Sequence, residues 1–117
     1  MRHPAERLRD ILEAIAAIER HRDGDKAAFE HDELRQAWFL RHLQIIGEAA
    51  RPLPAEVKAL APEIPWPKIV GMRNVPVHGY FDIDTDIVWQ VVASDVPVLK
   101  MAVLSLLASV ETRMSGS

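Results

Sequence analysis

Three residues in the second half of the chain are spaced so that they could act together: Arg73, His78 and Tyr80. An unperturbed histidine has a pKa of about 6.5, so it can take or give a proton near neutral pH. An arginine offers a fixed pair of donors that matches two oxygens of a phosphate group. The arginine and histidine therefore suit acid–base chemistry on a phosphodiester, and the tyrosine adds a hydroxyl group.

The spacing is informative only when all three residues are counted. Ten arginines and five histidines among 117 residues give about 0.4 Arg-x4-His pairs by chance. Requiring the single tyrosine two residues after the histidine lowers this expectation to about 0.004. A structural Arg–His contact and a buried aromatic ring with a satisfied hydroxyl are the alternatives. A bundle without a site fits the composition but leaves the three-residue pattern unexplained.

The composition narrows the chemistry. The chain is 49% hydrophobic and 26% charged, so we expect a single soluble globular domain over residues 1–117. It has no cysteine, which excludes disulfides, thiolate metal sites and cysteine nucleophiles. The net charge is −3. Contact with a nucleic acid would therefore depend on a local cluster of cations, or on surface supplied by a second subunit.

No targeting or membrane segment is expected from the sequence. The longest nearly uncharged stretch, Met101–Val110, is too short to cross a bilayer and fits a buried helix. Residues 1–6 lack the apolar region of a secretory signal. We therefore expect a cytoplasmic protein without a membrane partner.

The spacing of apolar residues predicts an all-α fold. Helices are expected over about 4–21, 32–50 and 66–78, and from Asp84 to about 111, with a short helix over about 55–60. We assign the inner face of the second helix to Leu34, Ala37, Trp38, Ile45 and Ala49. Pro97 is expected to kink or split the last helix. Short connections then imply an antiparallel bundle of four main helices plus a short helix, with a disordered tail at 113–117.

The sequence around the three residues resembles the HepT-like branch of the HEPN superfamily. The resemblance covers about residues 6–107 and is carried by the segments 43–49 (LQIIGEA), 65–74 (PWPKIVGMRN), 77–81 (VHGYF) and 87–89 (IVW). It implies a HEPN-like helical bundle and an RNase toxin that forms a homodimer. Its RX4HXY motif supplies the catalytic residues, here Arg73 and His78. It also implies an MNT-type nucleotidyltransferase antitoxin, as in a type VII-like toxin–antitoxin system, that silences the toxin by transferring AMP to Tyr80.

Cleavage of RNA without a metal needs a base, an acid and a cation that holds charge on the phosphate. One chain supplies one Arg73–His78 pair, whereas a two-fold dimer with these residues at its seam supplies both an acid and a base. Neither a cofactor nor a metal is expected. Two roles are open for Asn74. It could orient His78 or contact the phosphate, or it could be an amide on the helix surface without a function.

Pro76 departs from the family pattern, which has an aliphatic residue there. Residues five apart lie about 140° apart around a regular helix, so convergence of Arg73 and His78 depends on local geometry. Either the motif lies at a helix end, where a proline is harmless, or Pro76 distorts the site. The second possibility, together with the acidic net charge, favours another function: a non-catalytic HEPN adaptor or nucleotide-binding module that partners a nucleotidyltransferase.

The evidence for a catalytic or metal-binding role is weaker for the other candidate residues. His31 and His42 fit histidines of a helix surface or core, and no His, Asp or Glu group has convincing metal spacing. Asp82, Asp84 and Asp86 could suggest Mg²⁺, but capping of the last helix is the simpler role, with Asp84 as the N-cap. The three tryptophans fit core or dimer-interface aromatics rather than base-stacking platforms: Trp38, Trp66 and Trp89.

Overall fold

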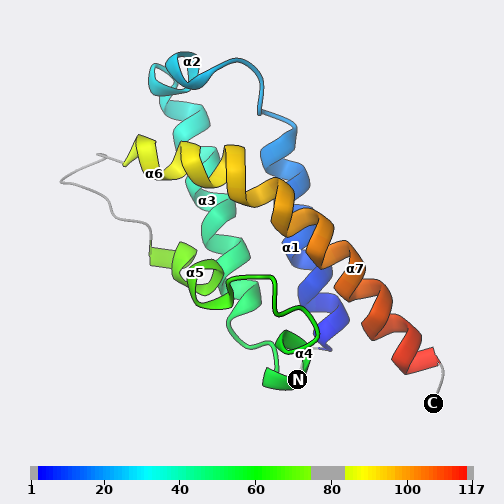
Figure 1. The fold of residues 1–117 in the computed structure, drawn as a ribbon. Coiled ribbons are helices and arrows are strands. Elements are labelled where there is room, and N and C mark those ends of the chain that lie inside the picture. Colours follow the sequence, from blue (N-terminus) through cyan, green and yellow to red (C-terminus); the bar gives the residue numbers. More distant parts are fainter. Residues whose placement is uncertain (1–2, 75–83, 116–117) are drawn as a thin grey trace.

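The computed structural model describes residues 3–74 and 84–115 of the 117-residue chain (Figure 1). Every regular element of this described part is a helix. The main ones are α1 (Pro4–Glu19), α3 (Glu33–Ala50), α5 (Trp66–Gly71) and α7 (Val96–Ser115). The shorter ones are α2 (Lys26–Glu30), α4 (Ala55–Lys58) and α6 (Thr85–Gln90). The predicted all-α bundle of four main helices is confirmed.

Helices α1 and α3 lie side by side and run in opposite directions (Figure 1). Pro4 begins α1, where its missing N–H costs nothing, and His3 Nδ1 accepts a hydrogen bond from the Ala5 N–H at 3.0 Å. The apolar residues that predicted α1 are buried against α3. They are Leu8, Ile11, Ile15 and Ile18, and their partners on α3 include Phe39, Leu43 and Ile46.

The predicted inner face of α3 is largely wrong. Leu34 is 85% exposed, Trp38 is 37% exposed and Ala37 is exposed as well, whereas Ala49 is buried and Ile45 is half-buried. The fully buried face instead consists of Phe39, Leu43, Ile46, Gly47 and Ala50. The reason is that α3 contacts α1, α2, α5 and α6. A helix that is covered on several sides has no single apolar stripe to detect.

Helix α2 was not predicted from the sequence, because five residues are too few to show a period. Gly24 adopts a φ of +80°, which favours glycine, and so turns the chain out of α1. Asp25 then caps α2 by accepting a hydrogen bond from the Ala28 N–H at 3.0 Å. This turn directs Phe29 into the core, where its ring lies 5.5 Å from that of Phe39.

Helices α6 and α7 are joined by a π-helical turn, η2 (Val91–Asp95), which ends two residues before Pro97. Proline has no N–H to donate to the preceding turn, so the helix widens there, as the predicted distortion at Pro97 requires. The joined helix crosses α3 and then runs along α1 (Figure 1). Ion pairs of Lys100 with Glu19 and of Glu111 with Arg9 hold α7 to α1.

One face of α7 is apolar and uncovered. Val98 is 63% exposed and Met101 is 68% exposed, and Leu104 lies one turn further along. By length and composition alone, the stretch Thr85–Thr112 could cross a membrane, although a core helix of a soluble protein meets the same two criteria. It is longer than the apolar run Met101–Val110 that the sequence analysis considered, since it includes α6 and η2.

Candidate active site

Arg73 and Asn74 lie in a 3₁₀ turn, η1 (Met72–Asn74), that follows α5 directly. Of the helix predicted over 66–78, the described part is α-helical from Trp66 to Gly71 and 3₁₀-helical from Met72 to Asn74. The sequence explains this, because the residue before a proline disfavours the α conformation and helices usually end at or before it. Arg73 thus lies in the last described turn before Pro76, at a helix end. His78, Tyr80, Pro76 and Asp82 lie outside the described residues.

The position of η1 is set by a glycine on α3. A Cβ atom at Gly47 would lie 2.7 Å from the backbone nitrogen of Arg73 and 3.0 Å from the carbonyl oxygen of Val70. Only a residue without a side chain allows this backbone approach. Gly47 belongs to the segment that carries the family resemblance, and no separate role is predicted for it from the sequence.

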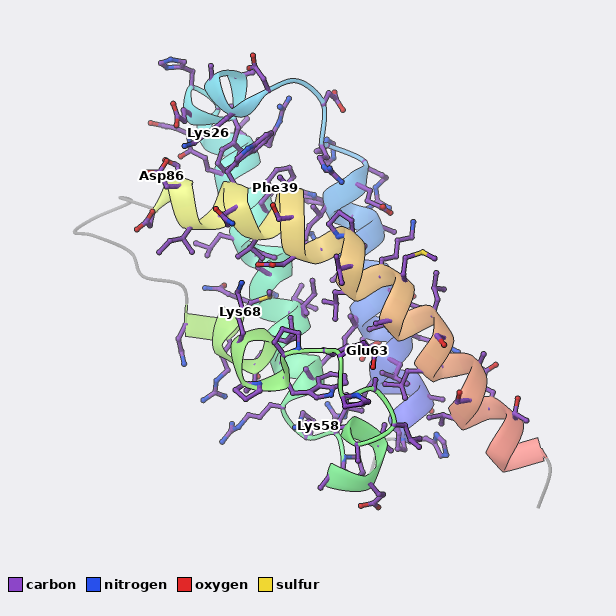
Figure 2. All side chains as sticks on the ribbon, in the orientation of Figure 1. Lys26, Phe39, Lys58, Glu63, Lys68 and Asp86 are labelled. Carbon is purple, nitrogen blue, oxygen red and sulfur yellow. The ribbon has the colours of Figure 1, made fainter. Side chains whose placement is uncertain are left out.

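Two polar contacts fix α5, which leads into η1. The Trp66 Nε1–H donates to the carbonyl oxygens of Lys58 and Ala61, at 3.0 and 3.2 Å. Lys68 Nζ lies 2.7 Å from Asp95 Oδ2 in the π-helical turn, an ion pair without the geometry of a hydrogen bond. Figure 2 shows Lys68 on the side of α5 that faces this turn. The chain is therefore held in place just before Arg73.

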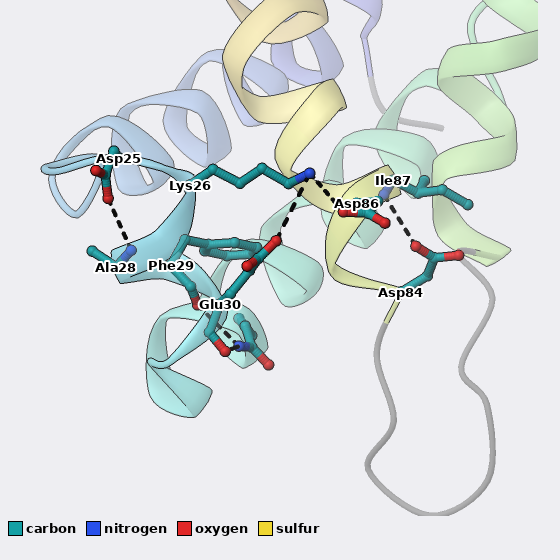
Figure 3. A network of polar contacts seen from close by, with 9 residues as sticks. Asp25, Lys26, Ala28, Phe29, Glu30, Asp84, Asp86 and Ile87 are labelled. Carbon is teal, nitrogen blue, oxygen red and sulfur yellow. Dashed lines mark hydrogen bonds and ion pairs between the residues drawn. The ribbon is translucent and has the colours of Figure 1, made fainter.

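The chain is also held in place where its described part resumes, at the start of α6 (Figure 3). Asp84 is the N-cap of α6 and accepts a hydrogen bond from the Ile87 N–H at 3.2 Å, which confirms its predicted role. Lys26 of α2 forms ion pairs with Asp86, at 2.7 Å, and with Glu30, at 3.8 Å. The hydrogen bond and charge of Asp86 raise the pKa of Lys26. Residues 75–83, which include His78 and Tyr80, therefore connect two anchored helix ends.

Arg73 lies at the edge of an open groove of about 960 Å³ between α1 and α3. Small side chains make the groove, because alanines line it from both helices: Ala14 and Ala17 on α1, and Ala49 on α3. The groove reaches from Arg73 and Glu48 at one end to Arg20 and Arg41 at the other.

The groove gathers cations in a chain whose net charge is −3. Its lining includes Arg7, Arg20, Arg41 and Arg73. Within the described ranges 3–74 and 84–115, none of these four guanidinium groups has a hydrogen-bond or ion-pair partner. The local cluster of cations that an acidic chain would need for nucleic-acid contact is thus present. Three carboxylates share the lining: Asp10, Glu13 and Glu48.

His42 lines the same groove, one turn after Trp38 on α3. Their ring centroids lie 4.5 Å apart, and the Trp38 Nε1–H donates to the Ala17 carbonyl at 2.8 Å. Burial lowers the pKa of His42 below its usual value, and the charges of Arg41 and Arg20 add to this, so the ring is neutral near pH 7. Its Nδ1 is buried without a partner in the described part of the chain, which leaves Nε2 for contact with a ligand.

The other polar and aromatic candidates lie at the surface or in the core. Asn74 is exposed, and His31 is exposed at the end of α2. Trp66 is buried, and Trp89 packs on Phe29 with centroids 5.4 Å apart, as expected of core aromatics. The described residues contain no group of three or more His, Asp or Glu side chains that could hold a metal.

His42 and the arginines of the α1–α3 groove are the residues that the sequence analysis missed. His42 was assigned to a helix surface or core. The signal that could have found the α1 side is the spacing of Arg7, Asp10, Ala14, Ala17 and Arg20, a stripe of small and charged residues beside the apolar one.

Comparison with known proteins decides the family. Residues 11–106 match the family described as "Ribonuclease HepT-like". This chain belongs to the HepT-like ribonuclease family. The predicted family resemblance is therefore confirmed over most of the chain, including the segments that contain Gly47, Arg73, His78 and Tyr80.

Relatives of this HepT-like chain carry ribonuclease names. The protein "Probable ribonuclease HepT" of Thermococcus cleftensis is 42% identical over 94 residues, which cover 80% of this chain and 86% of the relative. "Putative RNase MJ1380" of Methanocaldococcus jannaschii is 39% identical, with 82% and 89% covered. "Putative RNase TTE0752" of Caldanaerobacter subterraneus is 34% identical, with 92% and 96% covered. No solved structure matches the chain.

Proposed function

We propose that this protein is a metal-independent endoribonuclease that acts as the toxin of a type VII-like toxin–antitoxin system in the cytoplasm. The observation that carries the proposal is the position of Arg73. Its guanidinium group has no partner in the described part of the chain and lies at the edge of an open groove, five residues before His78. Membership of a family whose members are named ribonucleases supports the same reading.

The reaction follows from the chemistry of the two side chains. A neutral His78 takes the proton of the RNA 2′-hydroxyl, and the 2′-oxygen attacks the adjacent phosphorus. The bond to the 5′-oxygen breaks, and this oxygen receives a proton from a second, protonated histidine. Arg73 holds the charge on the phosphate through two N–H donors. The products are a 2′,3′-cyclic phosphate and a 5′-hydroxyl.

The second histidine requires a homodimer with His78 from both subunits at one site. The two-fold axis would also bring two copies of Arg73 to the phosphate, which suits the dianionic transition state. Asn74 adjoins Arg73 and is exposed, so its amide is available to the phosphate or to His78.

Regulation is proposed to act on Tyr80. A cognate MNT-type nucleotidyltransferase transfers AMP from ATP: the phenolic oxygen attacks the α-phosphorus, and pyrophosphate leaves. The product places a negative phosphodiester two residues from His78 and near the arginine that binds substrate phosphate. A bound phosphate on Tyr80 would compete for Arg73, so modification silences the toxin.

A non-catalytic adaptor that partners the nucleotidyltransferase is the second candidate. Pro76 between Arg73 and His78 and the net charge of −3 favour it. Against it, Arg73 lies at a helix end, where a nearby proline need not disturb a helix.

Expression of the chain alone, followed by an RNA-cleavage assay on the purified protein, tests the proposal. The wild type should arrest growth and cleave RNA, and His78→Ala should abolish both effects. His31→Ala, at the exposed histidine that follows α2, is the matched control and should behave as wild type. If wild type and His78→Ala grow equally well and neither cleaves RNA, the catalytic proposal is wrong and the adaptor remains.

A further inference from the structure

We propose that the α1–α3 groove binds a short single-stranded segment of RNA beside the phosphate that Arg73 contacts, with Arg20 and Arg41 holding the strand's backbone. The inference rests on the proposed function for Arg73. It adds a strand-binding site that lies outside the Arg73–His78–Tyr80 pattern.

The groove has cations at both ends. Arg73 packs at the level of Gly47 on α3, and Arg41 lies six residues earlier, about 9 Å along the helix axis at 1.5 Å per residue. Because α1 runs antiparallel to α3, Arg20 lies at the Arg41 end, as the hydrogen bond from Trp38 to Ala17 shows. A short stretch of single strand can bridge this distance.

The arginines of the groove differ from arginines elsewhere on the surface. Arg9 pairs with Glu111, and Arg35 contacts both Asp32 and the carbonyl oxygen of Asp23. In contrast, Arg20 and Arg41 have no such partner within the described part of the chain. Unpaired guanidinium groups on either side of a groove are available to neutralise phosphates, and release of counterions then favours binding.

The middle of the groove carries groups that can contact bases or sugars. His42 offers Nε2, and Gln44 adds an amide with both donors and acceptors. Neutral donors and acceptors suit base edges and the oxygens of the sugar. These groups lie between two helices, so bases must be unstacked to reach them, which favours a single strand over a duplex.

A second copy of the chain is the other possible occupant. Interfaces between copies are depleted of Asp and Glu, whereas three carboxylates line this groove: Asp10, Glu13 and Glu48. At about 960 Å³, the groove lies at the upper end of the range of ~300–1,000 Å³ typical of ligand sites. Both observations favour a ligand over a second copy, and the unpaired Arg20 and Arg41 favour an anionic one.

Binding of fluorescein-labelled 2′-O-methyl RNA of mixed sequence, which lacks the nucleophile for cleavage, tests the site by fluorescence anisotropy. The full chain carrying Arg20→Gln with Arg41→Gln should bind about tenfold more weakly or worse, and its salt slope should fall by about 1.4, or about 0.7 per lost phosphate contact. Arg22→Gln with Arg51→Gln removes the same charge at exposed positions outside the groove and should keep wild-type affinity.

Three outcomes overturn the inference. The first is wild-type affinity for RNA in the groove variant, Arg20→Gln with Arg41→Gln. The second is an equal loss of affinity in both double variants, because binding would then depend on net charge alone. Loss of a dimer in the groove variant by sedimentation would assign the groove to the contact between copies. The proposed function can fail separately. If the wild type cleaves no RNA but its binding depends on Arg20 and Arg41, the strand site stands and the proposed function is wrong. If the wild type cleaves RNA but its binding does not depend on these arginines, the proposed function stands and the strand site is wrong.

Discussion

Gly47 lies so close to the backbone of Arg73 that a Cβ atom at residue 47 would stand 2.7 Å from the Arg73 nitrogen. The two nearest atoms, the Arg73 nitrogen and the Val70 carbonyl oxygen at 3.0 Å, belong to the backbone of η1 and α5. They cannot move aside as a flexible side chain can. The absence of a side chain on α3 therefore determines where the candidate catalytic arginine lies.

Gly47→Ala should displace η1 and with it Arg73. We expect a loss of about 1–3 kcal/mol in the free energy of unfolding, as for overpacked sites. We also expect slower RNA cleavage by the protein that remains folded, because Arg73 is displaced. Gly71→Ala is the matched control, because a Cβ at Gly71 meets nothing within 4 Å. It should keep activity and gain up to ~1 kcal/mol of stability. Urea unfolding and cleavage assays measure both effects, and full activity in Gly47→Ala would contradict this account of Arg73.

Lys68→Met should destabilise the protein by about 1 kcal/mol, because it leaves the partly buried Asp95 carboxylate without its cation. Asp95→Asn should cost less, since it removes the ion pair without leaving a charge behind. The double variant should recover part of the free energy of unfolding that Lys68→Met loses. Urea unfolding of the four proteins of this double-mutant cycle checks the coupling, and strictly additive losses would show that the two side chains do not interact.

Stability should fall as the pH drops below about 6.5, with His42 as a contributor. Burial and the neighbouring Arg41 and Arg20 lower the pKa of His42 in the folded state, so the unfolded chain binds the proton first. The stability that a neutral His42 contributes is complete above the unfolded pKa and is lost as the pH falls through the folded pKa. His42→Gln should flatten this part of the curve of unfolding free energy against pH. An unchanged slope would exclude His42 as its source.

Tyr80 should carry one AMP per chain after co-expression with the cognate nucleotidyltransferase. Intact-protein mass spectrometry and peptide mapping measure the modification. Tyr80→Phe should cleave RNA as wild type does but escape silencing by the same partner, since it lacks the phenolic oxygen that accepts AMP. A fully neutralised complex with an unmodified Tyr80 would rule out this mode of regulation.

Local rules were sufficient to predict α1 and the start of α6. Leu8, Ile11 and Ile15 repeat along a helix that is buried on one side, and Asp84 caps α6 as its position indicates. The same rules failed on α3, where Trp38 was assigned to the inner face although it is partly exposed. Four neighbouring helices cover α3. The spacing of apolar residues along one helix does not indicate how many other helices pack against it.

The α1–α3 groove was less predictable than the helices. Arg7, Arg41 and Arg73 are far apart in the sequence and meet only because α1 and α3 pair in antiparallel fashion and η1 packs on Gly47. Arg73 itself was found from its spacing to His78 and Tyr80. A motif is contained in consecutive residues, whereas a groove depends on tertiary packing.

The π-helical turn η2 makes the length of the last helix critical. A wider turn holds an additional residue, so side chains before and after it are rotated by about 100° relative to an uninterrupted α-helix. This offset lets α6 face α2 and α3 while α7 faces α1. Deletion of Ser94 would remove the offset, so α6 and α7 could no longer both keep their apolar sides in the core. Single substitutions along this helix should therefore be tolerated better than the deletion of one residue.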